Sequence, residues 1–401
     1  MCFKKLIALI KPKEKNVPQE KPWQDDLLGY ERFSGKFNHV IKAMGSSFSI
    51  VSMEGYNGWG KTFFLKEWVK NLKQENEIAT YYSAWDINAL DQPLASFLNF
   101  LFEDLFVSHK VRKSITKQFA NINQELLSFK TLEKVMSKSP LGMFSVLLDA
   151  TKEADRKDIG SILREVKDLK RRKEGIQDFK KQLTKVVNKI RGEKNIYIMV
   201  DDLEVCRPKF IVDFLESIRC MLNIEGLIFV ISVDKEQSSV KKAIDAVLGS
   251  NFSLKHFTDL SLSLPKQAVA KFVKELFKNV RLPRKSKGVI VDSFIFYAET
   301  LSLSLKTIEH CIKKIKLTYS EDELPCPNLF SFLIILQSIN NDLYECLENK
   351  EAFERIADTY KSTMLIHING EKEWERLKAS LEAALAEKNF KAIRQIKGIL
   401  L

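Results

Sequence analysis

Residues 55–62 have the Gly-x4-Gly-Lys-Thr spacing of a loop that binds phosphate. Its glycines allow successive backbone N–H groups to turn inward around phosphate oxygens, and the following helix adds the positive end of its dipole. Lys61 is expected to reach the β- and γ-phosphates, and the Thr62 hydroxyl to ligate Mg²⁺. The spacing therefore predicts a site for ATP and Mg²⁺. The expected nucleotide-binding residues here are Gly55, Asn57, Gly58, Trp59, Gly60, Lys61, Thr62 and Phe63.

The sequence around this loop agrees with that chemistry. An apolar stretch at 48–53 precedes the loop and suits a buried strand. Apolar residues repeat at helical spacing after it; they are Phe64, Leu65, Trp68, Val69 and Leu72. A chance glycine-rich turn is the alternative interpretation. The order of strand, glycine loop and helix favours phosphate binding.

A second chemical element is an acidic cluster at the end of another apolar run. Residues 196–200 predict a strand buried on both faces of a parallel sheet, and Asp201, Asp202 and Glu204 follow it. Carboxylates at this end of a parallel strand face the crevice where such sheets bind ligands. We expect Asp201 to hold a water bound to Mg²⁺ and Asp202 to orient the attacking water. Glu204 is a further candidate catalytic acid. An acidic first turn of a helix would have the same composition.

Several separate motifs resemble the KAP P-loop NTPases, in particular the soluble bacterial members linked to phage exclusion. They span roughly residues 22–315 and comprise Trp23 to Gly29, the glycine loop with Phe63, Ala84-Trp85-Asp86 with Asp91 and Pro93, Asp201 to Glu204 with Cys206 and Pro208, and Val233 to Glu236. The resemblance implies an ATP-hydrolysing conformational switch that acts in antiphage defence. A polar residue ending the fourth strand, Asp234 or Ser232, could sense the γ-phosphate, and an ordinary turn at the end of a strand explains the same residues equally well. Lys306 holds the place of a cation near the γ-phosphate in the lid helix of related ATPases, and an ordinary solvent-facing lysine is the alternative interpretation.

The chain departs from the family pattern at three points. Asn57 and Trp59 occupy loop positions where relatives usually have other residues, and Val205 replaces the usual arginine after the acidic cluster. Many relatives also carry membrane-spanning helices between the two motifs, and this chain shows no such stretch. The altered loop and Val205 favour one alternative to a hydrolase, a nucleotide-gated interaction module with little or no hydrolysis. A small-molecule P-loop kinase is a less favoured alternative, because the acidic cluster and the lid resemble those of ATPases.

Five apolar runs alternate with helical patterns, which predicts an α/β fold: a parallel five-stranded sheet flanked by helices. The expected strands cover 48–53, 78–84, 196–200, 227–233 and 257–264. One strand separates the two motif strands along the chain, as in the ATPase branch. The expected division is an N-terminal basic and apolar arm (1–20), a split NTPase core (21–96 and 193–265), a helical insertion (97–192), a helical lid (266–319) and a C-terminal helical region (320–401).

The insertion carries the most basic segment of the chain. Residues 157–191 contain 12 Lys and Arg against 5 Asp and Glu, within a formal net charge of +12. A seven-residue apolar repeat, from Ile162 to Ile190, predicts a long packed helix here. Its basic face could bind nucleic acid through phosphate charge. A solvated helix face explains the same charges, because only Phe179 among them could stack on a base.

Composition bounds the remaining possibilities. No stretch reaches the ~20 apolar residues of a transmembrane helix. The six cysteines lack metal-binding spacing and indicate reduced thiols. We therefore expect a cytoplasmic protein, or a peripheral one at the inner face of the membrane if the arm at 1–20 lies on lipid. The C-terminal helices predict a protein partner or a homo-oligomer.

Overall fold

The computed structural model describes residues 21–87, 93–101, 104–105, 177, 180–181, 183–236, 238–319, 326–348, 351–386 and 391–400. Its centre is one parallel sheet with the strand order β2-β3-β4-β1-β5. The strands are β1 (Ser49–Gly55), β2 (Ile78–Ser83), β3 (Ile196–Asp201), β4 (Leu227–Asp234) and β5 (Leu260–Ser263). The predicted five-stranded α/β fold is confirmed.

The structure shortens one predicted strand and adds the order of the strands in the sheet. The fifth strand is shorter than expected, because residues Leu254–His256 form a 3₁₀ turn, η4, and the N–H of Phe257 closes that turn on the carbonyl of Leu254. The motif strands β1 and β3 are separated in the sheet by β4, whereas β2 separates them along the chain. This order leaves the acidic strand two positions away from the glycine-loop strand.

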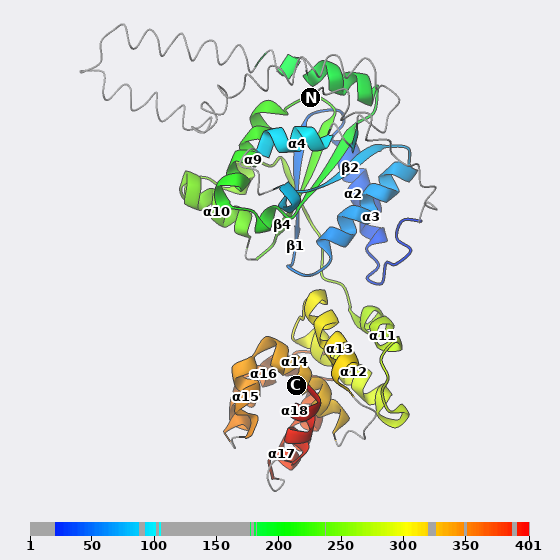
Figure 1. Ribbon diagram of the computed structural model, residues 1–401, viewed down its shortest axis with the longest axis vertical. Coiled ribbons are helices and arrows are strands. Elements are labelled where there is room, and N and C mark those ends of the chain that lie inside the picture. The colour runs from blue at the N-terminus through cyan, green and yellow to red at the C-terminus, as the bar shows by residue number, and fades with distance from the viewer. Residues whose placement is uncertain are drawn as a thin grey trace, which may run out of the picture.

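Helices cover both faces of the sheet, because alternate residues of each strand point to opposite sides. On one face α2 (Glu31–Ala43) and α3 (Lys61–Gln74) pack with Val51 and Met53 of β1 in one apolar cluster. On the other face α4 (Pro93–Leu101), α9 (Pro208–Met221) and α10 (Ser239–Leu248) pack with Ile50 in a second cluster. The two layers of helices are visible on either side of the strands in Figure 1.

All secondary-structure elements described after β5 are helices, and they form a group below the sheet in Figure 1. It comprises α11 (Ala270–Lys278), α12 (Arg284–Thr300), α13 (Leu305–Thr318), α14 (Pro327–Ile339), α15 (Asn341–Glu345), α16 (Ala352–Leu365), α17 (Gly370–Ala386) and α18 (Lys391–Leu400). Helix α14 is its centre, since every side chain from Leu329 to Leu336 is buried. The expected boundary at residue 320 therefore falls between helices that share one core, because α12 and α13 both pack on α14.

Most of the expected insertion lies outside the described residues, and so does the arm at 1–20. Its two ends are seen. Helix α4 crosses the expected boundary at 97, and Phe97 and Leu98 are buried beneath the sheet. Residues 183–191 are helical, and Leu183 and Val187 join the same cluster. The basic segment from 157 to 176 and its apolar repeat positions there belong to the part that is not described.

None of the helices in the described ranges combines the length and the apolar character that crossing a membrane requires.

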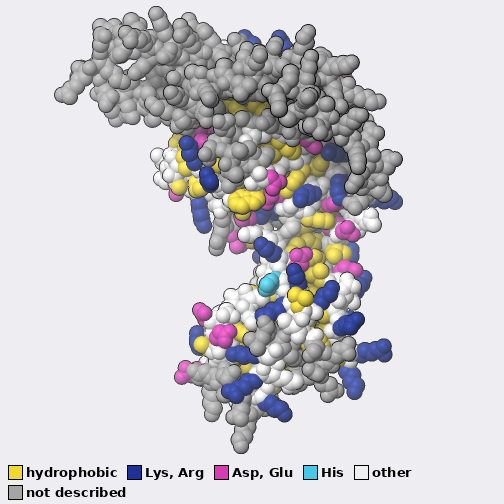
Figure 2. Space-filling view, viewed as in Figure 1, with side chains coloured by type: hydrophobic (Ala, Val, Ile, Leu, Met, Phe, Trp, Pro, Cys, Tyr) yellow, Lys and Arg dark blue, Asp and Glu magenta, His cyan; other side chains and the backbone are white. Residues whose placement is uncertain are grey.

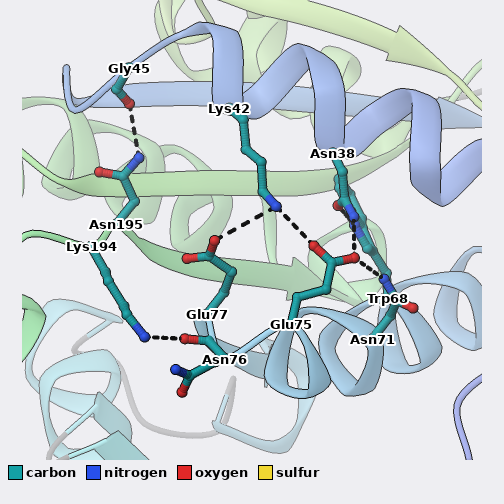
Figure 3. A network of polar contacts seen from close by, with 10 residues as sticks. All are labelled: Asn38, Lys42, Gly45, Trp68, Asn71, Glu75, Asn76, Glu77, Lys194 and Asn195. Carbon is teal, nitrogen blue, oxygen red and sulfur yellow. Dashed lines mark hydrogen bonds and ion pairs between the residues drawn. The ribbon is translucent and has the colours of Figure 1, made fainter.

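A polar network anchors the helix that follows the glycine loop (Figure 3). Glu75, just after α3, accepts hydrogen bonds from Lys42 at 2.8 Å and from Asn38 at 3.1 Å, both on α2. The hydrogen bond with Glu75 is the main reason that the pKa of Lys42 is raised. Asn38 in turn accepts a bond from the indole N–H of the buried Trp68, at 2.5 Å. The network thus fixes the axis of α3, and with it the direction of the helix N-terminus at the loop.

The glycine loop also carries a direct contact with the helical group. The N–H of Leu305, the first residue of α13, donates to the carbonyl of Gly58 at 2.8 Å. A Cβ atom on Gly58 would lie only 2.6 Å from the Cβ of Ser304, and Gly58 has a φ of +69°. Glycine is required here for two reasons: the left-handed backbone and the close approach of α13.

We therefore predict that Gly58→Ala lowers the free energy of unfolding by about 1–3 kcal/mol through overpacking and strain. Adding Ser304→Gly should recover part of this loss, because it removes the clashing Cβ while glycine remains an acceptable helix N-cap. Denaturant unfolding of the single and double variants provides the measurement. A double variant no more stable than Gly58→Ala would contradict the contact.

A second buried feature is the carboxyl group of Glu216 on α9. Glu216 is 4% exposed, and its Oε1 atom has no hydrogen-bond partner among the described residues. Burial, followed by the nearby charge of Asp213, raises its pKa from 4.5 to about 7. The folded chain therefore keeps a proton on Glu216 that the unfolded chain releases above pH 4.5, so this group lowers stability as pH rises from about 4.5 to about 7.

Glu216→Gln should consequently stabilise the protein by about 1–3 kcal/mol at pH 8, where the wild-type carboxylate is buried and charged. The gain should shrink at pH 5, where the folded wild type is already protonated. Urea midpoints at both pH values test this, with Glu375→Gln as an exposed control. Equal gains at the two pH values would show that titration of Glu216 is not responsible.

Candidate functional site

The glycine loop joins β1 to α3 and places Lys61 at the first position of that helix. The ammonium group of Lys61 forms an ion pair with Asp234 at the end of β4, and it donates to the carbonyl of Tyr56 at 3.3 Å. Both charged side chains are nearly buried. The structure thus brings together two residues that the sequence analysis assigned to the nucleotide, although they are far apart in the chain.

The loop is supported from the protein side. The hydroxyl of Tyr30 donates to the carbonyl of Trp59 at 2.6 Å, and Trp59 itself is buried. Gly60 has a left-handed backbone with a φ of +77°, next to Tyr30 and Leu305. Trp59 therefore serves packing at a position where relatives usually have a small residue. Asn57 is exposed, and Thr62 and Phe63 are half-buried at the start of α3.

The acidic cluster lies at the same edge of the sheet, beside the end of β2. One oxygen of the buried Asp201 accepts a hydrogen bond from the Tyr81 hydroxyl at 3.0 Å. One oxygen of Asp202 accepts from the Ser83 hydroxyl, also at 3.0 Å. The parallel register places Ser83 opposite Asp201, which explains why residues of β2 reach both acids.

Asp202 combines a left-handed backbone with a carboxyl group whose pKa is raised. Its φ is +59°, a left-handed conformation that aspartate tolerates better than most residues. Burial, followed by the charge of Asp201, raises the pKa of the Asp202 carboxyl. Burial and the charge of Asp201 also raise the pKa of Tyr81, so this phenol stays a hydrogen-bond donor. The raised pKa makes Asp202 a candidate proton acceptor.

Glu204 is turned toward the segment after β4. Its Oε1 accepts from the N–H of Asp234 at 2.7 Å and from the Ser238 hydroxyl at 2.9 Å. Its Oε2 accepts from the N–H of Val240 at 3.1 Å. This carboxylate satisfies backbone donors at the start of α10, a geometry that suits positioning of Asp234 more than proton transfer.

Two of the remaining expected residues, Lys306 and Ser232, lie within the described ranges but make no hydrogen bond or ion pair with Lys61. Lys306, in the first turn of α13, is exposed, although the adjacent Ser304 and Leu305 touch the glycine loop. Ser232 is buried within β4. Asp234 is thus the residue of the pair Ser232 and Asp234 that reaches Lys61.

Sequence reasoning missed Tyr81, Ser83, Tyr30 and Ser304. Tyr81 and Ser83 are polar residues near the end of a predicted strand, which was an available signal once that strand was paired with the acidic one. The other two contacts depend on packing between distant segments.

The donor set suits Mg²⁺. A magnesium site in a phosphate loop needs one or two protein oxygen ligands, with phosphate oxygens and waters completing the octahedron. Within the described ranges, no group of three or more Asp, Glu, His or Cys side chains forms a ready metal cage. The Thr62 hydroxyl and the Asp201 carboxylate, which keeps one oxygen outside its bond to Tyr81, fit a metal that arrives with the nucleotide.

Comparisons with solved structures find weak similarity to origin-recognition proteins. A chain of Drosophila ORC bound to poly(dA/dT) DNA and Cdc6 is 13% identical, with a TM-score of 0.34, and the match covers 89% of this chain and 48% of that chain. The Aeropyrum pernix ORC2 protein in ADPNP-ADP complexes is 11% identical, with a TM-score of 0.38, covering 97% of this chain and 96% of that one. This chain spans about half the length of the Drosophila chains it matches.

A search of curated proteins finds no match. The family comparison is decisive: the model of the KAP family P-loop domain matches residues 30–257, more than half of the 401-residue chain. The match includes the glycine loop, the acidic cluster and the strand end at Asp234. This chain belongs to the KAP family of P-loop NTPases.

Proposed function

We propose that this protein hydrolyses ATP with Mg²⁺ and uses the cycle as a conformational switch. The observation that carries the proposal is the contact of Lys61 with Asp234 at the mouth of the glycine loop. A polyphosphate in the loop competes with Asp234 for the lysine ammonium, so nucleotide binding frees the Asp234 carboxylate. The binding site and the strand end next to it are therefore linked by one exchangeable ion pair.

In the proposed reaction, the loop N–H groups and Lys61 bind the β- and γ-phosphates. Thr62 and Asp201 would hold Mg²⁺, which would neutralise part of the phosphate charge. Asp202 accepts a hydrogen bond from a water and orients its oxygen toward the γ-phosphorus. The new bond forms between that oxygen and phosphorus while the water proton passes to the Asp202 carboxylate. The bond to the β,γ-bridging oxygen breaks, and ADP and inorganic phosphate are the products.

Two contacts would carry the change away from the site. Glu204 accepts hydrogen bonds from the backbone of Asp234 and from the start of α10, so a shift of Asp234 would move that helix. The bond from Leu305 to Gly58 joins the loop to α13 and hence to the helical group. If bound nucleotide changes the affinity for a partner that binds these helices, that partner must change the affinity for nucleotide by the same factor. Lys306 remains our candidate for a γ-phosphate contact after such a movement.

A second candidate function is a nucleotide-gated interaction module that hydrolyses slowly. It is favoured by the hydrogen bonds already made by the two candidate catalytic acids, Asp202 with Ser83 and Glu204 with the start of α10. Val205, where relatives have arginine, is 57% exposed and supplies no charge. ATP binding without phosphate release would identify this second function, and phosphate transfer only to an added acceptor would identify a kinase.

The wider roles in the proposal come from family resemblance and composition. They are action in antiphage defence, a protein partner or a second copy of the chain, a cytoplasmic or peripheral membrane location, and contact with nucleic acid through 157–191. The last of these concerns residues that lie largely outside the described ranges.

The first test concerns binding. Lys61→Ala should weaken ATP binding roughly 10- to 100-fold, because it removes the charge-assisted bonds to the terminal phosphates. Isothermal titration calorimetry measures the change. Lys73→Ala, an exposed lysine of the same helix, is the matched control and should bind like the wild type. Wild-type affinity in Lys61→Ala would refute the site.

The second test concerns turnover. Asp202→Asn should keep ATP affinity within a few-fold and slow phosphate release roughly 100-fold or more, because the amide cannot accept the proton that the carboxylate accepts. Phosphate release with and without nucleic acid is the measurement, and Asp245→Asn on the exposed face of α10 is the control. If Asp202→Asn turned over normally, Glu204 would replace it as the candidate acid.

A further inference from the structure

Two lysines from different strand ends gather on the aromatic ring that follows the first loop glycine. Lys266 Nζ lies 3.9 Å from the centroid of the Tyr56 ring and 5.6 Å from that of Trp59. Lys235 Nζ lies 5.3 Å from the Tyr56 centroid. An ammonium group within about 6 Å of an aromatic face is attracted by the ring quadrupole. Tyr56 thus holds two cations, and its own carbonyl accepts a bond from a third, Lys61.

The backbone fixes where both lysines start. The N–H of Lys235 donates to the carbonyl of Gly55 at 2.9 Å, and the N–H of Leu264 donates to the carbonyl of Glu54 at 2.8 Å. These bonds continue the pairing of β4 and β5 with the two sides of β1. The carbonyl of Lys266 also accepts a bond from the Gln267 amide at 3.1 Å. The two lysines therefore lie just beyond the ends of the two strands that flank β1.

This arrangement concentrates positive charge that the described carboxylates do not balance. Asp234 is paired with Lys61, and within the described ranges neither Lys235 nor Lys266 makes an ion pair. Both lysines are exposed, so their ammonium groups can reach a ligand. Basic side chains are visible around the junction of the sheet with the helical group in Figure 2. Like charges held on one ring repel each other, and a bound anion relieves that repulsion.

We infer that Tyr56, with Trp59, holds Lys235 and Lys266 as additional phosphate-recognising cations that select nucleoside triphosphates over diphosphates. The Lys61 ammonium is expected at the β- and γ-phosphates, and the Asp234 carboxylate reaches it. Lys235 directly follows Asp234, so its charge is placed to recognise the terminal phosphate. This inference rests on the proposed nucleotide site and adds to it. It also gives a role to Tyr56, a loop residue that was not among the expected nucleotide-binding residues.

The test compares ATP and ADP affinities at fixed ionic strength for the full-length chain. Lys266→Gln should weaken ATP binding on the order of tenfold, the loss of one charge-assisted bond, and change ADP binding much less. Lys235→Gln should act in the same direction. Lys266→Arg should restore the preference for ATP, because arginine keeps both the charge and the contact with the ring.

Two further variants separate the ring from the charges. Tyr56→Leu keeps every lysine but removes the platform, and it should reduce the preference for ATP, whereas Tyr56→Phe should retain it. Lys255→Gln, in η4 before β5 and so at the opposite edge of the sheet, is the control for a simple change in net charge. Circular dichroism confirms that each variant is folded before the affinities are compared.

The outcomes distinguish this inference from the proposed function. If Lys61→Ala weakens ATP binding as expected, while Lys266→Gln, Lys235→Gln and Tyr56→Leu behave like Lys255→Gln, the site stands and the inference is overturned. Equal losses for ATP and ADP also overturn it. If the wild type binds neither nucleotide, the proposed function and the inference fail together. A selective loss for ATP in the variants of Lys266 and Tyr56 supports it.

Discussion

The common direction of five paired strands is the constraint on which the rest of this structure depends. Because β1, β3, β4 and β5 run parallel, the segments that follow them all begin at the C-terminal end of the sheet. Pairing of β1 with β4 puts Gly55 opposite Asp234, and pairing of β2 with β3 puts Ser83 opposite Asp201. The phosphate loop, its ion-pair partner and the acidic cluster are neighbours for this reason alone.

Carboxylates at the two edges of the sheet also serve the backbone. At the edge with the loop, Glu204 satisfies the N–H groups of Asp234 and Val240. At the opposite edge, Asp259 accepts from the N–H of Ile50 at 2.8 Å and pairs with Arg219. A buried N–H group without a partner would lower stability by more than one of these hydrogen bonds raises it. An acidic residue next to a nucleotide site can therefore have an architectural role, and contacts decide which role it has.

The helical group is joined to the sheet by a continuous core. One apolar cluster runs from Trp68 of α3 through Trp59 and Leu305 to residues of α14 and α17. A loop that packs into such a core cannot change shape without shifting its neighbours, because protein interiors are close-packed. The contact of Gly58 with the start of α13 gives the helices a direct connection to the phosphate-binding backbone.

The sequence by itself determined the kind of fold and the positions of the motifs. Local signals sufficed for the strands, the glycine loop and the apolar runs, since spacing and periodicity act over a few residues. It also indicated that Lys61 and Asp234 belong to one site. Tertiary structure alone decided that these two form an ion pair, that Glu204 binds the start of α10, and that Tyr56 carries Lys235 and Lys266. Those contacts join residues separated by up to about 200 positions, and only the order of strands in the sheet brings them together.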